Sequence, residues 1–292
     1  MNKAINIYRI GSVQQSENTD DDKLKTELKQ LAGKTIRRID SLTRLALIGA
    51  LRCCHSQPLP ERCGLIMTSQ YGSLNNSLSV LQEIFQQGSA PSPLKFVNTV
   101  SNAASFHIAA QLQLSNNNIF IAREHFALEG CLKLARQDIN NNHVDAVLIG
   151  LVAEIGLPLS IHRQRLELPQ DQQAQAASCW FLLAKNLIGK TPVVQLTDVA
   201  EPMDQSQLQL WLKTISLPIN RLLFGSEVSK DLQAMITAKL QPTQKHLITH
   251  HCEYSSALYL AQELQCLSTS DTLLFIDSNR HQQYSASLFS AK

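Results

Sequence analysis

Two residues near the middle of the chain have side chains that could carry out chemistry. His125 lies in the turn Arg123-Glu124-His125-Phe126, and Cys131 follows shortly after it. An imidazole in a turn could act as a general base, and a thiolate could act as a nucleophile. Cys131 falls on the apolar face of a helical pattern, so we expect a small core side chain there rather than a displaced nucleophile. Since His125 then has no evident nucleophile partner, we predict no catalytic residue here. A role of His125 as a general base stays open as the alternative.

The sequence shows no pattern typical of a metal site. Adjacent side chains rarely converge on one ion, so we interpret the neighbours His250 and His251 as hydrogen-bonded residues rather than as a metal pair. The cysteines form no CxxC pair and no Cys/His cluster at zinc spacing, which favours reduced and mostly buried thiols. They are Cys53, Cys54, Cys63, Cys131, Cys179, Cys252 and Cys266. We therefore expect neither a metal nor another cofactor.

The turn that contains His125 belongs to a βαβ unit over residues 119–154. A short apolar run at 119–122 predicts a strand, and apolar residues between 127 and 139 recur at the three-and-four spacing of a helix with one buried face. Residues 144–149 are apolar except for Asp145, which is typical of a central parallel strand that helices cover on both faces. The turn thus follows the carboxyl end of a strand, where α/β proteins usually bind their ligands.

The rest of the chain alternates strand and helix patterns, which indicates an α/β fold in two related halves. The expected strands are 4–8 (an edge strand), 63–68, 176–183, 193–196, 221–224, 272–276 and 285–290. The expected helices are 41–54, 74–87, one that contains Ile108 and Leu112, 208–215, 232–240 and 254–267. We expect a loop at 14–25. A connection at 157–173 divides the chain into an N-terminal half, 1–156, and a smaller C-terminal half, 157–292.

Composition excludes several classes of protein. With 292 residues, 44% of them hydrophobic, the chain can bury a substantial core. A net charge of +2 with scattered Lys and Arg gives no electrostatic footprint for nucleic acid. No apolar run reaches the roughly 18 residues that a membrane span needs, and the N-terminus lacks the apolar core of a signal peptide. We therefore expect a cytoplasmic location.

Several segments of the sequence, taken in order, resemble the N-terminal half of β-ketoacyl-acyl carrier protein synthases. These segments are RRIDSLTRLAL, GLIMTSQYGS, SPLKFVNTVSNAASFHIAAQLQL and VDAVLIGLVAE, and they cover roughly residues 37–154. The resemblance implies the thiolase fold, a layered α/β/α/β/α architecture, here with a reduced second half. From Trp180 onward the resemblance is faint.

The resemblance also implies where the catalytic residues of that family should stand, and most are missing. The family's nucleophilic cysteine lies at the tip of the turn before the βαβ helix, and counting back from Asp145 places His125 there. The strand-end motif His-Gly-Thr-Gly-Thr matches Phe224-Gly225-Ser226-Glu227-Val228, which puts Phe224 in the place of the first histidine. The second histidine matches His251.

The glycine-rich turn near the C-terminus of that family is replaced as well. Its Gly-Phe-Gly-Gly segment matches Asn279-Arg280-His281-Gln282-Gln283, which retains no glycine and puts His281 in a degenerate position. Long polar side chains remove the close backbone approach and the positive φ that glycine permits. The four degenerate active-site positions are therefore His125, Phe224, His251 and His281.

What the resemblance implies about function is a non-catalytic subunit of the chain length factor type. Such a pseudoenzyme pairs with an active ketosynthase, which holds the growing chain, as a heterodimer and shapes the tunnel that limits chain length. Acyl carrier protein carrying acyl chains is the other expected partner. The size of the chain favours aryl polyene or fatty-acid-like systems over aromatic polyketide systems. Two alternatives stay open: an acyltransferase or decarboxylase that uses His125 and His251, and a homodimeric protein that binds acyl chains or acyl carrier protein.

The resemblance further implies how the chain assembles. Thiolase-fold proteins pair through the strand that leads to the nucleophile turn, so this strand should run antiparallel to its mate in the partner. The expected interface residues are Asn118, Ile119, Phe120, Ile121, Ala122, Arg123 and Phe126.

Overall fold

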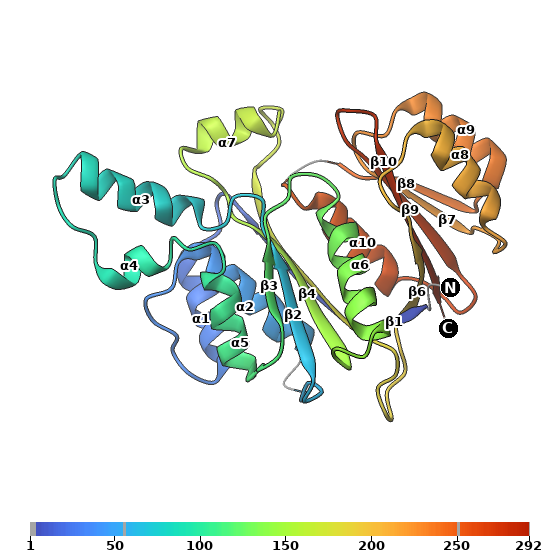
Figure 1. Ribbon diagram of the computed structural model, residues 1–292. Helices are drawn as coiled ribbons and strands as arrows, with labels where there is room; N and C mark the ends of the chain where they lie inside the picture. The colour runs from blue at the N-terminus through green and yellow to red at the C-terminus, as the bar shows by residue number, and fades with distance from the viewer. Residues whose placement is uncertain (1–3, 55–56, 250–251, 292) are drawn as a thin grey trace.

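The structure is a computed structural model that describes residues 4–54, 57–249 and 252–291. The strands of the described residues are β1 (Ile5–Ser16), β2 (Cys63–Thr68), β3 (Asn118–Ile121), β4 (Ala146–Ala153), β5 (Gln175–Ala184), β6 (Val194–Val199), β7 (Arg221–Phe224), β8 (Gln244–Leu247), β9 (Thr272–Ser278) and β10 (Tyr284–Ala291). They form one mixed sheet in the order β3-β2-β4-β5-β1-β6-β10-β9-β7-β8 (Figure 1).

Helices cover both faces of this sheet. They are α1 (Asp21–Ala32), α2 (Ser41–Cys54), α3 (Leu74–Phe85), α4 (Pro93–Val97), α5 (Ala103–Leu112), α6 (Ala127–Asn140), α7 (Leu159–Arg165), α8 (Gln205–Thr214), α9 (Lys230–Leu240) and α10 (Ser255–Gln265). Among the described residues, none of these helices is both long enough and apolar enough to cross a membrane.

The strand order repeats, which confirms the prediction of two related halves. The run β3-β2-β4-β5-β1 has the same connectivity as β8-β7-β9-β10-β6, with three parallel strands followed by two antiparallel ones in each. The halves join where β1 pairs antiparallel with β6, for example at Ile7 and Val194. The second half is smaller, since β6 has six residues where β1 has twelve. Because β5 pairs with β1 and β4, we propose a division between β5 and β6 rather than the predicted one between residues 156 and 157.

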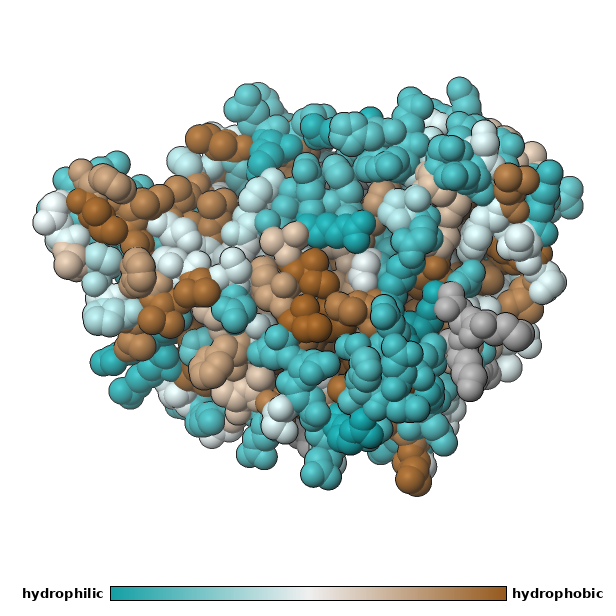
Figure 2. Space-filling view, in the orientation of Figure 1, coloured by the Kyte–Doolittle hydropathy of each residue, from teal (hydrophilic) through white to brown (hydrophobic). Residues whose placement is uncertain are grey.

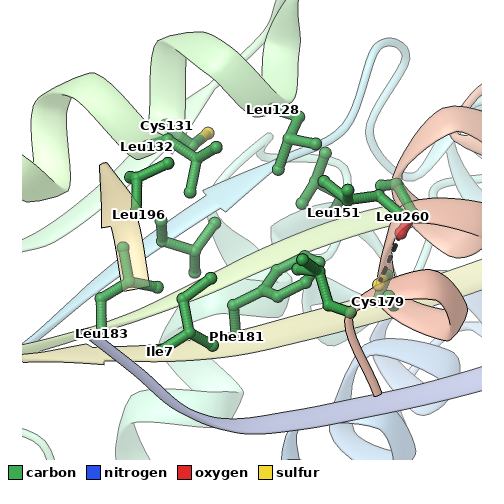
Figure 3. Packing of buried hydrophobic residues seen from close by; sticks show 14 of the residues in the cluster. Ile7, Leu128, Cys131, Leu132, Leu151, Cys179, Phe181, Leu183, Leu196 and Leu260 are labelled. Carbon is green, nitrogen blue, oxygen red and sulfur yellow. Dashed lines mark hydrogen bonds between the residues drawn. The ribbon is translucent and has the colours of Figure 1, made fainter. Parts of the chain in front are cut away.

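The molecule has five layers, and three apolar cores fill the spaces between them. One core fills the space between α1, α2 and α5 and the first half of the sheet, and another lies between α8 and α9 and the second half. The central core packs α6 and α10 between the two halves. Figure 3 shows Leu128, Cys131 and Leu132 on the buried side of α6, directed at strand residues such as Leu151. The layered α/β/α/β/α architecture is therefore confirmed, and Cys131 is a core residue with no exposed surface.

The βαβ unit that carries the turn has the predicted form. Helix α6 ends at Asn140. Strand β4 is buried along its whole length. Leu148 lies in the core under α1, α2 and α5, and Ile149 lies in the central core. Its pairing is mixed, however, since β4 runs parallel to β2 and antiparallel to β5.

Two predictions for the N-terminal region are wrong. Strand β1 is central rather than an edge strand, and it extends to Ser16. It can lie directly under α2 because Gly11 has no side chain, and a Cβ atom there would be 2.4 Å from the backbone nitrogen of Cys53. The predicted loop at 14–25 contains the start of α1, which Asp20 caps and which buries Leu24 and Leu28 against α2. Two leucines four residues apart suffice for an amphipathic helix even in a polar stretch.

Candidate functional site

A cavity of about 210 Å³ lies where the carboxyl ends of β4 and β9 meet the N-termini of α6 and α10. These two helices run side by side in the middle layer (Figure 1). Apolar side chains such as Leu128 and Leu151 form part of the wall, and polar groups such as Gln70 and Ser226 form the rest. Ligands of α/β proteins bind outside the carboxyl ends of strands, so this cavity is the candidate site.

The turn before α6 has an unusual backbone, and Phe126 rather than His125 occupies the N-cap position. Phe126 has φ 54° and ψ 36°, in the left-handed region, and its side chain is buried. A bulky residue in that region costs roughly 1–3 kcal/mol, and such strain collects at functional sites. His125 precedes it on the cavity wall, with Nε2 3.8 Å from Glu124 Oε1. The turn therefore presents an imidazole and a carboxylate, and it contains no thiol.

Two of the four degenerate positions lie together. The imidazole rings of His125 and His281 are 6.5 Å apart between centroids and meet edge to face at 87°. The turn after β9 thus reaches the turn before α6, although the two are far apart in the sequence. His251 lies outside the described residues.

Phe224, which the motif match puts in the place of the family's first histidine, lies away from the cavity. It ends β7, its ring is fully buried in the core between α8, α9 and the sheet, and it does not line the cavity. Side chains alternate across a strand, so the next residue, Gly225, faces the site. A Cβ atom at Gly225 would lie 1.9 Å from Asp277 Oδ1. The carboxyl group of Asp277 therefore takes the space beside the end of β7.

Sequence reasoning missed two carboxyl groups of the site whose pKa values are strongly raised. Glu129 lies in the first turn of α6 with only 3% of its surface exposed, and burial, followed by repulsion from Asp277, raises its pKa to about 8. Burial also raises the pKa of Asp277, to about 6. Both residues carried a signal, because Glu129 interrupts an apolar helix face and Asp277 ends the apolar run of β9. Near neutral pH the pair thus presents one carboxylic acid and one carboxylate.

A third buried carboxyl group, that of Glu253, also lines the cavity. Glu253 precedes α10 and pairs with Arg165 of α7, whose guanidinium lies 4.3 Å from the ring centroid of Tyr71. His162 lies beside this pair, with Nδ1 4.0 Å from Glu253 Oε1, and it accepts a hydrogen bond from the Gly156 amide at 3.2 Å. Burial lowers the pKa of His162. The Arg165 charge is therefore already neutralised by a protein carboxylate.

None of the described cysteines is set up as a nucleophile of this site. Burial raises the pKa of Cys131 to about 12 and that of Cys252 to about 11, and neither thiol lines the cavity. The described residues contain no group of three or more His, Cys, Asp or Glu side chains that could hold a metal ion.

Comparison with known families identifies the chain. The sequence model of the family described as "Beta-ketoacyl synthase, N-terminal domain" matches residues 12–208, which is more than half of the chain. The chain belongs to this family. No curated protein matches it at a significant level.

Solved structures share its fold. The structure titled "The ishigamide ketosynthase/chain length factor" superposes with a TM-score of 0.74 at 13% identity and covers 99% of each chain. A type II polyketide synthase acyl-carrier protein in complex with its ketosynthase gives a TM-score of 0.74 at 13% identity over 100% of both chains. A β-ketoacyl synthase from Burkholderia phymatum STM815 gives 0.72 at 10% identity and covers 99% of this chain and 100% of that one. The thiolase-like ketosynthase fold, expected from the sequence, is therefore confirmed.

Proposed function

We propose that the chain is a non-catalytic ketosynthase-like subunit of the chain length factor type. It pairs with an active β-ketoacyl synthase and helps to shape the space that a growing acyl chain occupies. The substrates are acyl chains carried by acyl carrier protein, in aryl polyene, polyketide or fatty-acid-like biosynthesis. The fold and the family membership support the ketosynthase-like part of this proposal.

The observation that carries the proposal is the replacement of the nucleophile. The turn before α6 keeps a strained backbone at its tip, but its residues are Glu124, His125 and Phe126. Condensation through a covalent acyl-enzyme needs an activated nucleophile, and a thiol with a raised pKa, as in Cys131, is almost entirely un-ionised at neutral pH. We therefore propose that the chain cannot form an acyl thioester.

The free edge of β3 supports the proposed pairing. Among the described strands β3 pairs only with β2, so its other edge offers unpaired backbone groups to a second strand. The strand has an exposed residue at its start, Asn118, and half-buried residues after it. Ala122 and Arg123 follow as exposed residues at its end.

Exposed apolar side chains on α3, α4 and α5 and just after α4 support the pairing as well. Helix α5 packs against β3, and the ring of Phe106 on α5 is 65% exposed. Further large apolar side chains are exposed on α3, on α4 and just after α4; they are Leu81, Ile84, Phe85, Leu94, Phe96, Val97 and Val100. Figure 2 shows brown patches over α3 and α4. Exposed apolar patches of this kind are typical of protein interfaces.

Co-expression with an intact ketosynthase tests the pairing. We expect the two chains to elute together in size-exclusion chromatography, and Ala122→Asp should separate them because it places a charge beside the β3 edge. Ala122 is exposed, so this variant should fold normally, whereas Phe120→Asp would also disturb the core that packs on Phe120. Gln137→Glu, at an exposed position of α6, is the matched control and should leave co-elution unchanged. Co-elution of the Ala122→Asp variant would contradict the interface.

Intact-protein mass spectrometry tests the loss of chemistry. After incubation with an acyl thioester, the purified chain should show no covalent acyl adduct, while the ketosynthase partner should show one. An adduct on this chain, or turnover of an acyl thioester by the chain alone, would favour the acyltransferase or decarboxylase alternative. A stable complex of two copies of this chain would favour the homodimeric alternative.

A further inference from the structure

Three buried polar atoms on residues that line the candidate cavity have no hydrogen-bond partner among the described residues. They are Glu129 Oε1, Glu253 Oε2 and Ser278 Oγ. Glu129 and Ser278 are at least nine-tenths buried, and so is the side chain of Glu253. They come from α6, from the segment before α10 and from the end of β9. An unsatisfied buried polar group costs roughly 1–3 kcal/mol, so three around one space are unusual unless something fills that space. Two of the three atoms are carboxyl oxygens, which favours an occupant that donates hydrogen bonds.

The charges around the cavity favour a cation. The described lining residues include three more carboxyl groups than guanidinium groups. Arg165 is paired with Glu253, and Arg280 is paired with Glu167 at 3.3 Å and approaches Glu227 at 3.9 Å. Among the described residues, no arginine or lysine forms an ion pair of this kind with the carboxyl group of Glu129 or Asp277.

Other cations near Glu129 do not occupy the cavity. Lys133, one helical turn further along α6, pairs with Glu201. Arg123 packs over Gly130, where its Nη1 would be 2.7 Å from a Cβ atom. Neither residue lines the cavity, although both favour the ionised form of Glu129.

The size and the apolar wall of the cavity favour an organic cation over a bare ion. A volume of about 210 Å³ corresponds to that of roughly seven water molecules in the liquid, which admits a molecule of several carbon atoms. Leu128, Leu151 and Leu166 line the same space as the carboxyl groups. A ligand with one cationic end and a short carbon chain would satisfy the carboxyl oxygens and contact the leucines.

We propose that this cavity binds a small primary alkylamine, whose ammonium group sits between Glu129 and Asp277 while its carbon chain lies along Leu128 and Leu151. This site goes beyond the proposed function, because it requires neither a ketosynthase partner nor an acyl chain. The ammonium group donates hydrogen bonds to both carboxylates, which satisfies the free Oε1 atom of Glu129.

Binding of an ammonium ion has a proton balance that can be measured. Glu129, with its pKa raised to about 8, holds a proton at pH 7, whereas Asp277, with a pKa of about 6, has mostly lost its proton. An ammonium ion stabilises both ionised carboxylates, so Glu129 transfers its proton to the buffer when the amine binds. The other titratable groups that line the cavity are Tyr71, Glu124, His125, Arg165, Glu227, Glu253, Tyr254 and Arg280. Affinity should therefore rise with pH while the amine itself stays protonated.

Isothermal titration calorimetry of the purified chain with n-butylammonium tests the proposal. We expect a Kd below about 1 mM at pH 8 and at least about tenfold weaker binding at pH 6. Titrations at pH 7 in two buffers with different ionisation enthalpies should show release of close to one proton per amine bound. Butan-1-ol and butyrate, matched in length but neutral and anionic, should bind at least about tenfold more weakly because they provide no ammonium charge.

Variants of the carboxyl pair complete the test. Glu129→Gln should weaken amine binding at least about tenfold and abolish the proton release, and Asp277→Asn should weaken binding to a similar degree. Glu61→Gln, at an exposed position away from the cavity, should leave the Kd within about twofold. If a variant fails to fold, the pH dependence and the butan-1-ol comparison of the unaltered chain still decide. No binding at about 10 mM amine, equal binding of butan-1-ol, displacement of the amine by Mg²⁺ or Ca²⁺ at equal concentration, or a Glu129→Gln variant with unchanged affinity would each overturn the proposal.

Discussion

Replacing Glu129 by Gln should stabilise the protein at neutral and alkaline pH in the absence of any ligand. The pKa of this carboxyl group is raised from 4.5 to about 8 in the folded chain. Between these values the folded state keeps a proton that the unfolded state has lost, so the free energy of unfolding falls as pH rises through this window. One pKa unit corresponds to about 1.4 kcal/mol, which gives a cost of up to about 3 kcal/mol at pH 7. Glutamine has nearly the same shape and cannot ionise, so it avoids this cost.

Urea denaturation of the two proteins measures the difference. At pH 4.5 the unaltered chain and Glu129→Gln should unfold with similar free energies, and at pH 8 the variant should be more stable by about 4 kcal/mol. Asp277 is present in both proteins, so the difference reports mainly on Glu129. Glu61→Gln, whose side chain is exposed, should follow the unaltered chain at both pH values within about 0.5 kcal/mol. If Glu129→Gln showed the same pH dependence as the unaltered chain, Glu129 would ionise freely in the folded state, and the reasoning about the carboxyl pair would be refuted.

Three further changes have defined outcomes. Cys131→Ser should leave product formation by a reconstituted ketosynthase complex within a few-fold, since the thiol is buried in the central core; loss of product in a folded variant would mean that Cys131 is a displaced nucleophile. Gly225→Ala should destabilise the chain by at least about 1 kcal/mol in thermal denaturation and weaken butylammonium binding, because a Cβ atom there would lie 1.9 Å from Asp277 Oδ1. Unchanged stability and affinity of this variant would contradict the prediction. Arg165→Lys should cost about 1 kcal/mol of stability, because lysine cannot reproduce the planar contact over the Tyr71 ring together with the Glu253 pair; an unchanged melting temperature would show that the contact is weak.

Local pattern was enough to predict the parts of the fold that depend on neighbouring residues. The βαβ unit, the buried strand β4 and the closing pair β9 and β10 follow from apolar periodicity. The position of β1 could not be read in this way. Its apolar residues Ile5 and Ile7 suit an edge strand or a central one equally, and the choice is made by pairing with β5 and β6, which lie far along the chain.

The candidate site could be predicted only in part, for a related reason. The structure brings the rings of His125 and His281 together, whereas the ring of Phe224 is buried in the core under α8 and α9. A shift of one residue along a strand reverses the direction of a side chain, so the roles that the motif match assigns stay predictions. The carboxyl pair was missed because Glu129 and Asp277 come from different halves of the chain. Each of them alone resembles an ordinary charged residue.

The features that work against folding are concentrated around one cavity. Phe126 has a left-handed backbone at the start of α6, Glu129 is buried with an unsatisfied oxygen, and Asp277 is held against Gly225. Each feature costs stability, whereas the surrounding strands and helices are apolar and well packed. If this region only filled space in the fold, apolar side chains in these places would make the protein more stable. Volume-conserving apolar replacements usually cost little. Strain and unsatisfied polar atoms in one place are what a binding site requires, because the ligand supplies the missing partners. The turn before α6 contains no thiol, and the buried carboxyl groups beside it are the groups that we propose bind a ligand there.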